Sequence, residues 1–161
     1  MVLLNKPDKA ALFRDLRRVS DMSVAETLVK LIPISEENEQ HRPINEFGSE
    51  LDRGYALGWR MLAHHGTESV QLRLMRENGS KLDTKAVYKG EGWLLLSIYG
   101  TEAAMMELIR NHPKELDLEN GQGWRNLEKY GTEKVKAEVE LRKRSTRARS
   151  GSDQDQESLS L

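Results

Sequence analysis

The sequence contains no cysteine, so neither disulfide bonds nor thiolate chemistry can contribute to its structure or function. This absence excludes the small disulfide-stabilised scaffolds of secreted proteins. Long hydrophobic runs are also missing, and no stretch approaches the roughly 20 apolar residues that a membrane-spanning helix needs. The first eight residues lack the apolar centre of a signal peptide. We therefore expect a protein of the cytoplasm without a membrane span.

Motifs that carry chemistry are equally scarce. The chain has no glycine-rich phosphate loop, no Gly-x-Ser-x-Gly elbow and no pattern of paired carboxylates. His64 and His65 are adjacent, but no third ligand lies at a spacing typical of a metal site. We expect a non-enzymatic protein without cofactor or metal, and an enzyme with a diffuse site is the remaining alternative. The net charge of −1 excludes a polyanion binder that uses its whole surface.

What the sequence does contain is one motif in three copies, Gly-Trp followed by Gly-Thr-Glu. The copies are Gly58–Glu68, Gly92–Glu102 and Gly123–Glu133, spaced 34 and 31 residues apart, and they hold all three tryptophans. A period of this size is typical of repeat solenoids. The composition, 37% hydrophobic and 32% charged, fits a thin protein in which each repeat buries only the faces that it shares with its neighbours.

Each copy of the motif predicts a pair of helices. Trp59, Leu62 and Ala63 share one helix face, Gly66 is expected to end that helix, and Thr67 to cap the next. A divergent first copy is expected at residues 7–32, where a shift of 46 residues places Phe13 on Trp59 and Leu28 on Leu74. The stretch 33–52, rich in glutamate and containing two prolines, is expected to be a long acidic loop.

These patterns divide the chain into a repeat domain, residues 1–141, and a tail, residues 142–161. The tail is first basic and then acidic and carries few core-forming residues, so we expect it to be disordered. The expected repeats cover about residues 7–32, 53–83, 87–117 and 118–141.

The motif copies resemble the ankyrin-repeat family over roughly residues 51–141. In that family the first helix ends in a small residue, two variable residues and glycine, as in Ala63–Gly66 and Ser97–Gly100. A segment similar to the family's finger follows the second helix at Gly79–Asp83 and Lys114–Asp117. The Thr-Pro-Leu-His signature is missing, which leaves another helix-pair solenoid open. The fold class expected is all-α, a short α-solenoid of about four stacked helix-turn-helix repeats.

The resemblance also implies a binding surface. In ankyrin-like stacks the two residues before the turn glycine, and residues of the finger, face the concave groove. Carried over to this sequence, the partner-binding positions are His64, His65, Ile98, Tyr99, Lys129 and Tyr130, with finger positions near Arg53, Val87, Tyr88, Leu118 and Glu119. Tyrosine is enriched at interaction hot spots. We therefore predict a monomer that binds another protein as an adaptor, an immunity protein or an effector delivered into a host cell. Packing against adjacent fingers is an equally open role for these residues.

The basic part of the tail supports an alternative function. It contains five cationic residues, Arg142, Lys143, Arg144, Arg147 and Arg149, without interleaved aromatics. Such a run can bind nucleic acid or another anionic surface, and a solvated tail end explains it at least as well.

Overall fold

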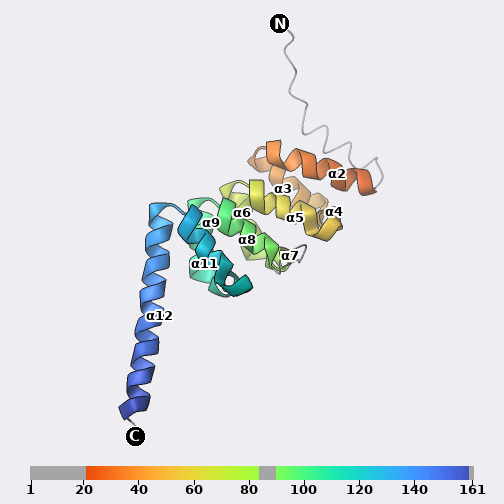
Figure 1. Cartoon of the computed structure of the whole chain (residues 1–161). Coiled ribbons are helices and arrows are strands. Elements are labelled where there is room, and N and C mark those ends of the chain that lie inside the picture. Colours follow the sequence, from red (N-terminus) through yellow and green to blue (C-terminus); the bar gives the residue numbers. More distant parts are fainter. Residues whose placement is uncertain (1–20, 84–89, 160–161) are drawn as a thin grey trace.

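The computed structural model describes residues 21–83 and 90–159, and every regular element in these residues is helical (Figure 1). The expected all-α class is therefore confirmed. The elements are α2 (Asp21–Leu31), the 3-10 helix η2 (Ile32–Ile34), α3 (Glu37–Glu46), α4 (Gly48–Leu51), α5 (Arg53–His65), α6 (Glu68–Glu77), α7 (Gly79–Leu82), α8 (Glu91–Tyr99), α9 (Glu102–Asn111), α10 (Pro113–Leu116), α11 (Leu118–Tyr130) and α12 (Glu133–Leu159). The helix expected before Ser20 lies outside the described residues.

The longer helices pack in two rows. The first row contains α2, α5, α8 and α11, each in contact with the next, and the second row contains α3, α6, α9 and α12 in the same way. Helices of the two rows pair as α5 with α6, α8 with α9 and α11 with α12. The short helices α4, α7 and α10 each contact two consecutive first-row helices, and each packs against the glycine before the tryptophan of the later one.

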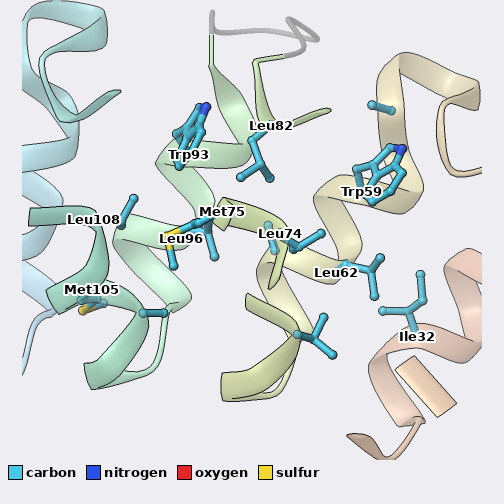
Figure 2. Close-up of a cluster of buried hydrophobic side chains, with 14 of the residues drawn as sticks. Ile32, Trp59, Leu62, Leu74, Met75, Leu82, Trp93, Leu96, Met105 and Leu108 are labelled. Carbon is cyan, nitrogen blue, oxygen red and sulfur yellow. The ribbon is translucent and has the colours of Figure 1, made fainter. Parts of the chain in front are cut away.

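The three tryptophans attach the first row to the short helices. Their indole N–H groups donate to an aspartate at the end of the preceding short helix, in the pairs Trp59–Asp52, Trp93–Asp83 and Trp124–Asp117, each at 2.7 Å. Trp59 and Trp93 are buried in the apolar core, where Figure 2 shows them beside Leu62 and Leu82. Trp124, in the last first-row helix, is only partly buried. Trp59 and Trp93 are therefore packing residues of the core, and Trp124 packs against its edge.

The glycine before each tryptophan allows a close backbone approach. A Cβ atom added to Gly58 would lie 2.8 Å from the Cα of Leu51, and one added to Gly92 would lie 2.7 Å from the Cα of Leu82. The same distance for Gly123 and Leu116 is 2.8 Å. Real Cβ atoms do not approach backbone so closely, since packed interiors leave no room for the overlap. Gly-Trp is therefore a docking motif for the short helix.

Two buried glutamines join consecutive helix pairs. The side-chain amide of Gln71 in α6 donates to Ala63 O (3.0 Å) and Tyr99 O (3.4 Å), and its oxygen accepts the N–H of Thr101 (2.9 Å). Gln40 in α3 makes the corresponding bonds to Ile32 O (3.3 Å), His65 O (3.1 Å) and Thr67 N (2.9 Å). Buried amides that satisfy turn carbonyls and amides hold those turns in place.

These bonds correct the expected alignment of the first copy. Each hydrogen-bond partner of Gln40 stands 31 or 34 residues before the corresponding partner of Gln71. Ile32 of η2 therefore corresponds to Ala63 of α5, and α2 together with η2 forms the first helix of the first row. A shift of 31 residues places Leu28 at the position of Trp59. The expected shift of 46, which paired Leu28 with Leu74 in the second row, is wrong, because it matched apolar spacing without the helix contacts.

The expected acidic loop at residues 33–52 is also wrong, because α3 and α4 occupy most of it. Glu36 and Glu39 form a reciprocal capping box, in which Glu39 Oε2 accepts the N–H of Glu36 at 3.2 Å. The glutamates that suggested a solvated loop therefore stabilise the start of a helix. Pro43 lies inside α3 and is buried.

The expected disordered tail is corrected as well. Helix α12 continues through residues 142–159 and extends away from the two rows (Figure 1). Arginine and lysine are good helix formers, and Arg142 lies 3.7 Å from Glu138 one turn earlier. Lys143 forms an ion pair with Glu128 of α11. In the described part of the chain, no helix is both long enough and apolar enough to span a membrane.

Candidate functional site

A line of four side chains marks the carboxyl-terminal ends of the first-row elements. Ile34, His65, Tyr99 and Tyr130 are the last residues of η2, α5, α8 and α11, and each stands three residues before a second-row helix begins. We call these four residues the turn ridge. Ile34, Tyr99 and Tyr130 expose 55%, 49% and 48% of their surface, and His65 is half-buried. The structure thus gives His65, Tyr99 and Tyr130 equivalent positions.

The prediction missed Ile34, the first member of the ridge. The misplaced shift of 46 residues left Ile34 in the supposed loop. The signal was present, because Ser35-Glu36-Glu37 precedes Gly66-Thr67-Glu68 by 31 residues, the same spacing that separates the second and third motif copies.

Aromatic rings meet in the middle of the ridge. The ring of His64 lies edge-on to Tyr99 of the next first-row helix, with centroids 3.7 Å apart and planes at 68°. His64 Nδ1 also contacts His65 Nε2. Burial, and secondarily the charge of His65, lower the pKa of His64. At the last turn, Lys129 Nζ lies 5.1 Å from the ring centroid of Tyr130.

Ile98 lies in a neighbouring groove of about 520 Å³ between α8 and α11, which we call the α8 groove. Leu94, Leu95 and Ile98 of α8 form its apolar side. The equivalent positions carry Arg60, Met61 and His64 in α5, and Arg125, Asn126 and Lys129 in α11. The other lining residues are Glu91, Glu119, Gln122 and Asn126. The outward face of α8 is thus more apolar than those of its neighbours.

Two arginines, Arg60 of α5 and Arg125 of α11, support left-handed turns, and the equivalent position in α8 is Leu94. Arg60 donates to Gly54 O (3.2 Å) and Tyr55 O (3.1 Å), and Arg125 donates to Glu119 O (3.3 Å) and Asn120 O (2.6 Å). Gly54–Ala56 and Glu119–Gly121 have positive φ angles. The predicted finger positions Arg53, Leu118 and Glu119 therefore lie in or beside tight left-handed turns. Val87 and Tyr88 lie outside the described residues.

The basic positions gather away from the turn ridge. Arg142 and Lys143, with Thr146, line a groove of about 580 Å³ beside Trp124 and α10. Arg142 and Lys143 pair with glutamates, whereas Arg144 is exposed. The side chains of Arg147 and Arg149 lie outside the described part of α12.

Ionisable groups in the described residues form no cluster of three or more histidine, aspartate or glutamate side chains that could hold a metal ion. Exposed apolar and aromatic side chains recur at the ends of three first-row elements. Comparison of the chain with protein-family models, curated proteins and solved structures gives no match in any of the three.

Proposed function

We propose that the protein is a non-enzymatic, monomeric binding module that contacts another protein along the turn ridge and the adjoining first-row face. The four helix pairs would form a short, ankyrin-like solenoid. Support for the solenoid comes from the two rows of helices, the three equal Trp–Asp bonds and the matching bonds of Gln40 and Gln71. Its connections differ from β-hairpin fingers, since α4, α7 and α10 are single helical turns.

The observation that carries the proposal is the alignment of the exposed apolar side chains. In the described residues, five large apolar or aromatic side chains are exposed, and Ile34, Tyr99 and Tyr130 of the turn ridge are three of them. Scattered exposed apolar residues are ordinary, but a contiguous set marks an interaction surface. Tyrosine adds a large contact area and a hydroxyl group at low entropic cost. Such a module would act as an adaptor, as an immunity protein or as an effector inside a host cell.

The test is affinity capture from an extract of the cells in which the protein acts. Wild type is compared with Tyr99→Ala/Tyr130→Ala, and each captured protein is quantified by mass spectrometry. The matched control is Tyr55→Ala, because Tyr55 is, at 70%, the most exposed of the tyrosines that the structure describes and lies off the ridge. We expect the double variant to lose a partner that the control retains. Equal capture by all three folded proteins, with folding checked by circular dichroism, would refute the proposal.

A second proposal uses the basic residues of α12. Its support is the groove in which Arg142 and Lys143 lie beside Trp124, with Arg144 exposed nearby. These cations would bind nucleic acid or another anionic surface, with an affinity that falls steeply as salt is added. Truncation after Leu141 should abolish binding to a labelled DNA duplex in an anisotropy titration. Retained binding would exclude this role.

A further inference from the structure

The turns that carry the ridge also carry carboxylates. The first three turns, residues 33–38, 64–69 and 98–103, contain glutamates and neither lysine nor arginine. In each turn one glutamate, Glu37, Glu68 or Glu102, is the first residue of a second-row helix, three positions after a ridge residue. All three glutamates are exposed. The fourth turn, residues 129–134, differs because Lys129 and Lys134 accompany Glu133.

These three carboxylates differ from others on the same helices. Arg73 pairs with Glu77 at 2.8 Å, and Arg76 pairs with Glu107 through two hydrogen bonds of 3.0 and 3.2 Å. Glu37, Glu68 and Glu102 have no ion pair within the described residues. Their position at a helix start stabilises the ionised carboxylates. Glu68 and Glu102 line one groove with Arg76, Arg110 and Lys134, none of which forms an ion pair with either of them in the part of the chain that the structure describes.

The last turn shows how a cation fits against the ridge. Lys129 places its ammonium group over the ring of Tyr130, with Glu133 three residues further along the chain. An aromatic or aliphatic surface holds the stem and charge of a lysine or arginine, and a nearby carboxylate pairs with its head group. The first three turns provide the same two components but contain neither lysine nor arginine.

We propose that the first three turns bind an extended basic segment of the partner protein, with one lysine or arginine side chain at each turn. This inference rests on the proposed function and specifies the chemistry of the partner. Packed helices lie about 8–10 Å apart. A segment in the extended polyproline II conformation advances about 3.1 Å per residue with about three residues per turn, so every third side chain lies on the same face. Consecutive turns therefore meet every third residue of the segment. The lysines at the fourth turn repel a further basic residue and mark the end of the basic stretch.

Two isomeric peptides test the spacing. Fluorescein-labelled Arg-Ala-Ala-Arg-Ala-Ala-Arg and Ala-Ala-Arg-Arg-Arg-Ala-Ala have the same composition and charge, and only the first places arginine at every third residue. Fluorescence anisotropy with the full chain at physiological salt should show about tenfold tighter binding of the spaced peptide. Equal affinities would mean unspecific attraction and would overturn the inference.

Matched variants test the carboxylates. Glu68→Gln/Glu102→Gln removes two charges at the turns, and Glu77→Gln/Glu140→Gln removes two exposed charges away from them. Binding of the spaced peptide should weaken about tenfold in the first variant and stay near wild type in the second. Equal weakening in both overturns the inference. Thermal melts monitored by circular dichroism show that each variant is folded.

The outcomes separate this inference from the function on which it rests. Capture of a protein that depends on Tyr99 and Tyr130, together with equal affinity for the two peptides, overturns the inference and leaves the proposed function standing. Failure of both tests overturns both. Success of both identifies the turn ridge as a surface for spaced cationic residues.

Discussion

The two ends of α5, α8 and α11 differ in how much their residues vary from one helix to the next. At the end next to the short helices, the same residues recur. A glycine packs against a leucine of the short helix, and a tryptophan donates a hydrogen bond to the aspartate that follows that leucine. At the turn end, the ridge position holds isoleucine, histidine, tyrosine and tyrosine in succession. A residue that touches neighbouring backbone has few possible replacements, whereas one that faces solvent has many. The copies within this one chain therefore distinguish packing residues from candidate contact residues.

The largest loss of stability at the end next to the short helices should come from Trp59→Ala. Removing the buried indole leaves a cavity between α4 and α5 and should lower the free energy of unfolding by about 3–5 kcal/mol. Trp124→Ala should cost less, because Trp124 is only partly buried. Urea unfolding followed by circular dichroism measures both. Equal losses in the two variants would show that the extent of burial does not determine how much each tryptophan contributes to stability.

Gly92→Ala tests the close approach to the short helix. Alanine favours helix, but here its Cβ would lie 2.7 Å from the Cα of Leu82, so we expect a loss of about 1–3 kcal/mol. Gly48→Ala is the control, because no atom lies within 4 Å of the added Cβ. That variant should be neutral or slightly more stable in the same urea experiment. A stable Gly92→Ala protein would argue against the docking role of Gly-Trp.

The smallest effect concerns the turn end, where His64 responds to pH. Its pKa lies below the ordinary value of 6.5, chiefly because of burial, so the folded state binds fewer protons than the unfolded state. Protonation of His64 therefore does not reduce the free energy of unfolding above pH 6.5, and it reduces this free energy as the pH falls toward the lowered pKa. His64→Ile, which introduces the residue of the equivalent position in α8, should reduce this decline.

The experiment compares urea midpoints of wild type and His64→Ile at about pH 5.5 and about pH 7.5. Burial also lowers the pKa of His112, so part of the decline persists in the variant. His112→Asn, with the residue found at the equivalent Asn78, removes that second contribution. If the urea midpoint of His64→Ile falls as much between the two pH values as that of wild type, His64 does not cause the decline.

Local patterns predicted the elements that depend on neighbouring residues. The helical face of Trp59, Leu62 and Ala63 is buried as expected, and Gly66 ends α5. The cap predicted at Thr67 differs in detail, since its side chain makes no capping bond. The equivalent Thr101 does accept the N–H of Ala104, at 3.3 Å.

Features that depend on distant contacts could not be predicted in the same way. Gln40 and Gln71 are polar, yet they are buried because they bond to carbonyls and amides of two neighbouring turns. Their identity at a spacing of 31 residues was the available signal. Ile34 belongs to the ridge for a related reason, since the bonds of Gln40 and the packing of α2 against α5 establish the register that the spacing of 31 residues indicates.

The glutamine bonds have a consequence for how the molecule opens. Gln40 and Gln71 tie the turns at Thr67 and Thr101, but Met105 stands at the third equivalent position and offers no amide to Thr132. In the proposed solenoid, stability is the sum of each helix pair and its contact with the next, so a weaker junction lets the end beyond it fray first. Opening fluctuations should therefore begin where the α11–α12 pair meets α8 and α9, and spread toward the amino-terminal pairs. Hydrogen exchange would record this as a gradient of protection along the turns.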